Sequence, residues 1–171
     1  AEKHTMTRQA YLDIIYKKTA CLIGVSASAG AMAVGASQQK VALMRRFGEA
    51  VGMAFQIQDD ILDYTPSAQT GKPVCNDLRE GKITLPLLTV LDRASEERRA
   101  DLLDRLARCH EDDEAVEYLR LAVEREGGLS AAAEVMQGYV SRAVGMLSDY
   151  DDSDYRSALV NLCAYIVERD R

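Results

Sequence analysis

The sequence predicts an all-α fold, and three observations support this prediction. Proline occurs only three times, first at Pro66, so no proline interrupts a helix in the first third of the chain. Apolar residues recur at helical spacing between residues 41 and 64 and again in several later segments. With 47% hydrophobic and 28% charged residues, the composition is that of a globular protein with enough apolar residues for one core.

Two long helices are expected first, one from Thr7, its candidate cap, to about Ser37, and one from Val41 to Tyr64. The uncharged stretch 19–39 has the length of a membrane span, but it is rich in Ala, Gly and Ser, so we expect no transmembrane segment. Small residues instead allow neighbouring helices to approach closely. These residues are Gly24, Ala27, Ser28, Ala31 and Gly35.

A loop is predicted over residues 65–83, where proline, glycine and polar residues replace the apolar pattern. A loop of this length in a compact domain is more often a binding loop or lid than a plain connection. Another helix should follow, with Thr84 as its cap and Pro86 in its first turn. Four more are expected at 96–109, 113–126, 130–148 and 154–168, with a glycine break at 127–128.

Three carboxylates lie in the otherwise apolar end of the second helix. At about 100° per residue, Gln56, Asp59, Asp60 and Asp63 fall within an arc of about 100° and share one face. Two carboxylates about 6 Å apart repel by about 3 kcal/mol at an effective dielectric constant of 20, so an enclosed cluster needs cations. Hard oxygen ligands without a nearby His or Cys favour Mg²⁺ over zinc. The alternative is an acidic helix end that is simply solvated.

Charge and cysteine content restrict the partners and the compartment. A net charge of −6 without a Lys/Arg cluster argues against nucleic acids and anionic membrane surfaces as partners. Any anionic substrate would therefore need metal ions. The four cysteines are scattered without a CxxC pair, which indicates neither a zinc site nor a disulfide framework and favours a cytoplasmic protein.

Two motifs, in order along the chain, resemble those of the trans-polyprenyl diphosphate synthases. The stretch 55–64 reads FQIQDDILDY and is followed by Gly-Lys-Pro at 71–73 and by GKITLP at 81–86, as in the family's second aspartate-rich region. Upstream, Tyr11 to Ile15 and the Lys18-Thr19-Ala20 triplet resemble the family's lysine–threonine helix. The resemblance covers nearly the whole chain and implies the C-terminal part of an isoprenoid-synthase-type helical bundle.

The resemblance implies head-to-tail prenyl transfer, in which isopentenyl diphosphate attacks the carbocation formed from an allylic diphosphate. Lys18 would contact the allylic diphosphate, with Thr19 facing the same substrate. Gln56 would border the allylic pocket and Phe55 would help to wall it. The residues expected to act in catalysis, including two of the metal ligands, are Lys18, Thr19, Gln56, Asp59 and Asp60.

The same resemblance assigns the charged residues around the motif. Asp59 is expected to be the first direct Mg²⁺ ligand and Asp60 the second, with Asp63 acting through water. Lys72 and Lys82 would contact phosphate, although Lys82 could instead pair with an acidic neighbour such as Glu80.

Nothing upstream of Tyr11 matches the family's first aspartate-rich motif or its basic residues for isopentenyl diphosphate. We therefore expect residues 1–171 to be the C-terminal half of a single synthase domain, without its N-terminal half. This half alone is expected to be inactive. The chain length of the product does not follow from these residues. The full-length enzyme is expected to be a homodimer, or this half to pair with an N-terminal half. Alternatives are a small subunit of a split or heteromeric synthase and a non-catalytic module that binds a prenyl lipid or a partner helix. A class I terpene cyclase fits the lysine–threonine and Gly-Lys-Pro motifs less well.

Overall fold

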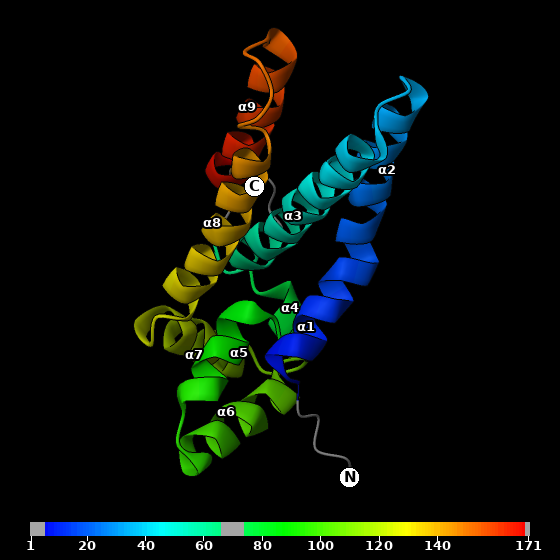
Figure 1. Ribbon diagram of the computed structural model, residues 1–171. Helices are drawn as coiled ribbons and strands as arrows, with labels where there is room; N and C mark the ends of the chain where they lie inside the picture. The colour runs from blue at the N-terminus through cyan, green and yellow to red at the C-terminus, as the bar shows by residue number, and fades with distance from the viewer. Residues whose placement is uncertain (1–5, 66–73, 170–171) are drawn as a thin grey trace. The chain divides into compact units, whose positions relative to one another are not determined.

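The computed structural model describes residues 6–65 and 74–169, whose regular secondary structure is helical without a strand and confirms the predicted all-α class (Figure 1). Ordered along the chain, the helices are α1 (Arg8–Ile15), the π-helical η1 (Tyr16–Ala20), α2 (Cys21–Ala33), α3 (Gln38–Leu62), α4 (Asn76–Arg79), α5 (Leu85–Arg93), α6 (Glu96–Arg108), α7 (Asp113–Arg125), α8 (Gly128–Met146) and α9 (Asp154–Glu168). No helix within these residues is both long and apolar enough to cross a membrane.

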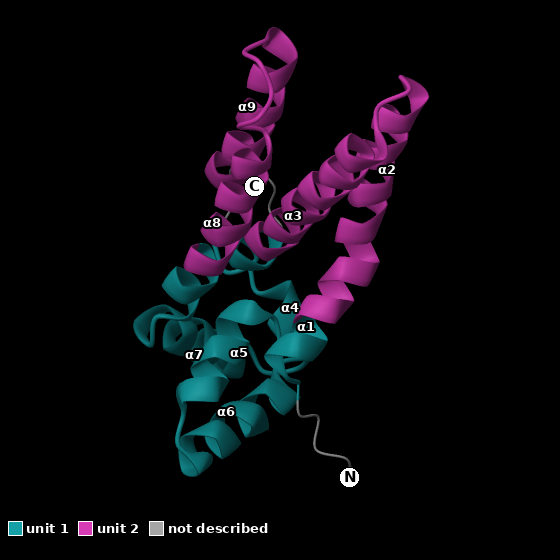
Figure 2. Ribbon diagram, in the orientation of Figure 1, with its two compact units in different colours: residues 1–11, 59–133, 170–171 teal, residues 12–58, 134–169 magenta. Residues whose placement is uncertain are grey.

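The chain divides into two compact units (Figure 2). Unit 1 comprises residues 1–11, 59–133 and 170–171, and unit 2 comprises residues 12–58 and 134–169. Helix α3 contributes Gln38–Gln58 to unit 2 and its last four residues to unit 1.

The first predicted helix is a continuous helical segment made of α1, η1 and α2. Thr7 is confirmed as its cap, because the Thr7 hydroxyl accepts the N–H of Ala10 at 3.1 Å. The segment ends at Gly35, which has φ +69°, and the N–H groups of Gly35 and Ala36 bond back to the last helical carbonyls. Gly35 therefore terminates the helix and does not serve close helix packing. Helix α2 ends at Ala33, so the predicted end at about Ser37 was too late.

In unit 2, small residues bring α2 and η1 close to α3. A Cβ atom added to Gly48 would lie 2.7 Å from the Ile23 carbonyl oxygen and 2.9 Å from Gly24 Cα. One added to Gly52 would lie 2.5 Å from Ala20 Cα. Since carbon atoms in ordinary contact are about 3.5–4.0 Å apart, only glycine fits these positions without movement of the backbone. The predicted close approach is confirmed at Gly24.

Unit 1 has its own apolar core, in which α7 packs against α4, α5 and α6. Burying a large aliphatic side chain contributes about 1.5–3 kcal/mol, so this core is the main source of stability of the unit. Its fully buried leucines and valines include Leu78, Leu85, Leu87, Leu88, Leu91, Leu102, Leu119 and Val123. Pro86 lies in the first turn of α5, as predicted. Thr84 occupies the N-cap position, but its hydroxyl is buried and makes no hydrogen bond within the described chain.

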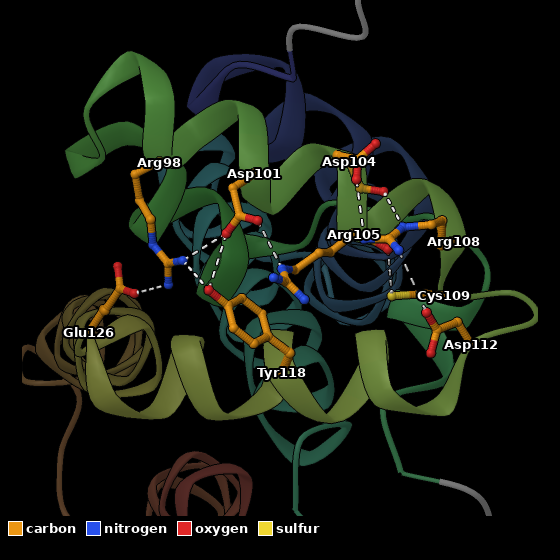
Figure 3. A network of polar contacts seen from close by, with 9 residues as sticks. All are labelled: Arg98, Asp101, Asp104, Arg105, Arg108, Cys109, Asp112, Tyr118 and Glu126. Atoms are coloured by element: carbon orange, nitrogen blue, oxygen red, sulfur yellow. Dashed lines mark hydrogen bonds and ion pairs between the residues drawn. The ribbon is translucent and has the colours of Figure 1, made fainter.

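A polar network on the surface of unit 1 joins α6 to α7 (Figure 3). The Tyr118 hydroxyl donates to Asp101 at 3.1 Å and accepts from Arg98, while the Arg105 guanidinium lies 3.6 Å from the centre of the Tyr118 ring. Nearby, the Asp112 carboxylate caps α7 by accepting two backbone N–H groups. This acidic stretch is thus structural, as its position at a helix start predicts.

Helix α9 is tied to α3 within unit 2. Ser153 caps α9 by accepting the N–H of Arg156 at 3.2 Å. Near the other end of α9, the Gln58 amide donates to the Val167 carbonyl at 3.4 Å. The last turn of α9 therefore lies beside the segment of α3 that leads into the acidic motif.

Candidate active site

The acidic motif lies at the C-terminal end of α3, and two of its three carboxylates are buried. Asp60 is 5% exposed and Asp63 3%, whereas Asp59 is exposed. The apolar neighbours Ile57 and Leu62 are also buried. The motif is therefore partly enclosed, as the flanking apolar residues predict, and it is not a fully solvated helix end.

Asp60 is held by a tyrosine from α1. The Tyr11 hydroxyl, in a side chain that is 3% exposed, donates to Asp60 Oδ2 at 2.6 Å. That distance is typical of a hydroxyl bonded to an ionised carboxylate, which is one of the stronger hydrogen bonds in proteins. The contact joins residues that are 49 positions apart in the sequence. Tyr11 thus orients one oxygen of the second predicted metal ligand.

Asp63 fastens the end of α3 to the start of α4. Its carboxylate accepts the Asp77 N–H at 2.9 Å, and its backbone carbonyl accepts the Cys75 N–H at 2.8 Å. Cys75 adopts a left-handed conformation with φ 61°, which costs energy in a residue other than glycine and is maintained by these surrounding contacts. Burial, followed by the nearby Asp63 carboxylate, raises the pKa of Asp77.

The lysine–threonine motif lies in η1, a five-residue π-helical turn. The Thr19 hydroxyl donates to the Gln56 side-chain oxygen at 3.0 Å, and Gln56 is 5% exposed. Lys18 is exposed beside this pair, as is Lys17. A π-helical turn inserts an extra residue per turn and is frequent at functional sites, because it turns side chains out of the regular helical register. Two of the predicted substrate residues, Thr19 and Gln56, are thus in direct contact.

A second tyrosine anchors the same π-helical turn to α3. The Tyr16 hydroxyl donates to Glu49 Oε1 at 3.0 Å, and Arg45 donates to the same oxygen at 3.1 Å. Here a carboxylate is shared by a phenol and a guanidinium, both from unit 2.

Phe55 is half-buried, and one side of its ring is covered from the end of the chain. The Arg169 guanidinium lies 4.1 Å from the centre of the Phe55 ring, and Arg169 Nη2 donates to the Phe55 carbonyl at 3.5 Å. A cation over an aromatic face stabilises by about 0.5–2 kcal/mol, depending on how far the pair is desolvated. The residue after α9 thereby restrains the predicted pocket wall.

The two loop lysines have different outcomes. The Lys82 ammonium pairs with Glu80 and with Asp77 at 3.4 Å, so the alternative that the sequence left open for Lys82 is present in the structure. These pairs raise the pKa of Lys82, with the Glu80 hydrogen bond as the largest cause. A phosphate contact by Lys82 stays a prediction. Lys72 lies outside the described residues.

The donor set is suited to a hard divalent cation that also binds phosphate. In residues 6–65 and 74–169, no group of three or more His, Cys, Asp or Glu side chains is arranged to hold a metal ion. Mg²⁺ usually takes one or two carboxylates, several waters and substrate phosphates, so it does not need such a cage. Exposed Asp59 and the oriented Asp60 match that pattern. The carboxylate of Asp63 bonds to the protein backbone, which is compatible with the predicted action through water.

Sequence reasoning missed three residues that hold the predicted ones in place: Tyr11, Tyr16 and Arg169. The two tyrosines carried a weak signal, because they precede a lysine–threonine motif on a helix expected to pack against the acidic one. For Arg169, no local pattern indicates a contact with a residue 114 positions earlier.

Comparison with known proteins gives consistent results. The polyprenyl synthetase family model matches residues 1–123. A short chain isoprenyl diphosphate synthase from Methanothermobacter thermautotrophicus is 38% identical over 99% of this chain and 52% of its own length. A protein named heptaprenyl diphosphate synthase component 2 from Geobacillus stearothermophilus is 35% identical over 95% of this chain and 50% of its own length.

Solved structures agree with these relatives. The polyprenyl synthase from Caulobacter crescentus CB15, in complex with calcium and isoprenyl diphosphate, superimposes with a TM-score of 0.88 at 34% identity, covering 98% of this chain and 51% of that one. The chain thus spans about half the length of the relatives that it matches. With its buried aspartates at the end of α3 and its lysine–threonine turn, this chain belongs to the polyprenyl synthetase family.

Proposed function

We propose that this chain forms the second aspartate-rich half of the active site of a prenyltransferase that joins an allylic diphosphate to isopentenyl diphosphate in the presence of Mg²⁺. The observation that carries the proposal is the enclosed acidic motif on α3, where Asp60 is 5% exposed and hydrogen-bonded next to exposed Asp59. Burial of an ionisable group is costly, so a buried carboxylate beside an exposed one in the same motif is retained for a function more often than for stability.

In this proposal, Asp59 and Asp60 hold the cation and Asp63 contributes through water. A divalent cation, when bound, stabilises the negative charge that develops on the departing diphosphate. Lys18, whose side chain is exposed, is assigned to the allylic diphosphate by the family resemblance. These are electrostatic contributions, which are commonly worth several kcal/mol of a reaction barrier.

The remaining residues would shape the allylic site. The Thr19–Gln56 hydrogen bond fixes the Gln56 amide, so its dipole has one orientation toward the bound substrate. Phe55, restrained by Arg169, supplies an apolar wall that excludes water from a carbocation. Lys72 is proposed as a further phosphate contact, and Lys82 as one that first has to leave Glu80 and Asp77.

The active site is proposed to need another half, either an N-terminal half of the same domain or a separate subunit. Large apolar side chains on α1, α2 and α9 and just after α2 are exposed, which is typical of a surface that another segment covers. They are Ile14, Leu22, Val25, Met32, Val34, Tyr155, Leu162 and Tyr165. The second candidate, a subunit of a heteromeric synthase, is favoured by the relative whose name includes component 2. A cytoplasmic location and a dimeric full-length enzyme belong to the same proposal.

The test is to assay the 171-residue chain with an allylic diphosphate, isopentenyl diphosphate and Mg²⁺, first alone and then mixed with an N-terminal half that carries the first aspartate-rich motif. We expect no product from the chain alone and product from the mixture. Robust turnover by the chain alone would refute the need for a second half. No turnover by any completed form would refute the prenyltransferase proposal.

A second measurement separates an enzyme half from a non-catalytic module. Mg²⁺ with inorganic diphosphate should raise the melting temperature of the chain more than either does alone, because a ligand stabilises the folded state that binds it. The Asp60→Asn variant should lose this effect. Asp104→Asn, at a side chain that is 74% exposed on α6, is the matched control and should keep it. An unchanged melting temperature with both ligands would exclude the metal site.

A further inference from the structure

We propose that Tyr11 is a positioning residue that sets the orientation of the Asp60 carboxylate for a cation–diphosphate complex. The inference rests on the function proposed above and adds a residue to it. Tyr11 lies on α1, outside the acidic motif and outside the lysine–threonine triplet.

The geometry is that of a fixed contact between two buried groups. The Tyr11 hydroxyl donates to Asp60 Oδ2 at 2.6 Å, and both residues belong to unit 1. Tyr11 is 3% exposed and Asp60 5%, so water has little access to either side chain. A buried phenol rarely turns away from its partner, because an unsatisfied polar group in the interior is costly. The hydrogen bond therefore restricts rotation of the carboxylate about its Cβ–Cγ bond.

The kind of donor matters for binding a cation. A phenol is neutral, so it orients a carboxylate without neutralising its negative charge. A guanidinium would do both, as Arg45 does for Glu49 beside the hydroxyl of Tyr16. The Tyr11 contact thus combines a fixed direction with a retained charge, which is what a residue behind a metal ligand has to provide.

The Tyr118–Asp101 pair offers a matched control. It is also a tyrosine hydroxyl donating to a carboxylate of unit 1, at 3.1 Å, but Asp101 lies on α6, outside the acidic motif. Tyr118→Phe therefore removes the same chemical group from a contact outside the proposed site. A difference between the two variants reports on Asp60 and not on hydroxyl loss in general.

The experiment measures binding of Mn²⁺, with and without inorganic diphosphate, by electron paramagnetic resonance of the 171-residue chain. Loss of hydrogen bonds behind a metal ligand typically weakens metal affinity about 10–100-fold. We expect Tyr11→Phe to weaken Mn²⁺–diphosphate binding at least about 10-fold, at the lower end of that range, and Tyr118→Phe to leave it unchanged. In an Asp60→Asn background, Tyr11→Phe should cause no further loss, because the positioned carboxylate is already gone.

The outcomes separate the two proposals. If Asp60→Asn weakens binding and Tyr11→Phe does not, the positioning role is overturned and the metal site stands. An equal loss in Tyr11→Phe and Tyr118→Phe, or additive losses with Asp60→Asn, would also overturn it. No binding by the unmodified chain overturns both. Should Tyr11→Phe not fold, Asp60→Glu tests the same point, since it keeps the charge but moves the carboxylate; affinity like that of the unmodified chain would refute positioning.

Discussion

Replacing Gly52 by alanine is expected to destabilise the protein relative to the same change at Gly138. Both glycines lie inside long helices, Gly52 in α3 and Gly138 in α8. A Cβ atom at Gly52 would lie 2.5 Å from Ala20 Cα and 3.0 Å from Ala20 Cβ. A Cβ atom at Gly138 would have no heavy atom within 4 Å outside its own helix. The two variants share the chemical change and differ in the space around it.

The magnitudes follow from this geometry. Alanine is about 1 kcal/mol more favourable than glycine inside a helix, so Gly138→Ala should stabilise by about that amount. At Gly52 the same gain is opposed by a contact about 1 Å too short, and overpacking of this kind costs about 1–3 kcal/mol. The free energies of unfolding of the two variants should therefore differ by about 1–3 kcal/mol, or roughly 2–12 °C in melting temperature for a chain of this size.

Urea denaturation followed by far-UV circular dichroism measures both variants under one set of conditions. Because Ala20 directly follows Thr19, Gly52→Ala should also weaken diphosphate binding, whereas Gly138→Ala should not. Equal stabilisation by the two substitutions would show that α3 does not approach Ala20 as closely as the structure has it. The close packing that we infer from the glycines would then be wrong.

Three further predictions concern unit 1. Burial raises the pKa of Cys75 from 9.0 to about 12, so the native state binds this proton more tightly than the unfolded chain. Its contribution to the free energy of unfolding is complete below about pH 9 and is lost as pH rises toward 12, by up to about 1.4 kcal/mol per pH unit. Cys75→Ala should therefore reduce the pH dependence of the urea midpoint across that range. Tyr118→Phe removes two hydrogen bonds but keeps the ring beneath Arg105. It should therefore lower the free energy of unfolding, measured by urea denaturation, by about 0.5–1.5 kcal/mol. An unchanged free energy of unfolding would mean that these hydrogen bonds contribute nothing to stability. Asp112→Ala removes the cap of α7 and should lower the free energy of unfolding by about 1 kcal/mol, measured by thermal melts. A decrease below about 0.5 kcal/mol, the usual size for a surface substitution, would contradict the capping role.

The helices themselves could be predicted because their causes are local. Thr7 caps the first helix as predicted, and Gly127 with its positive φ separates α7 from α8, because each acts on backbone groups within a few residues. Gly128, predicted to belong to the break, is instead the first residue of α8. A predicted helix end was wrong where the same residue type could serve either helix packing or helix termination. Gly35 was assigned to close helix packing, but its positive φ makes it a helix terminus.

For the candidate site, too, the local features could be predicted from the sequence and the long-range contacts could not. The sequence by itself determined which residue types share the face of α3, because helical periodicity places Gln56, Asp59, Asp60 and Asp63 within one arc. Only the tertiary structure decided how they differ: Asp60 is buried against Tyr11, Asp63 holds the start of α4, and Asp59 is exposed. The physical reason is that burial and hydrogen-bond partners depend on chain segments many residues away, which periodicity along one helix does not encode.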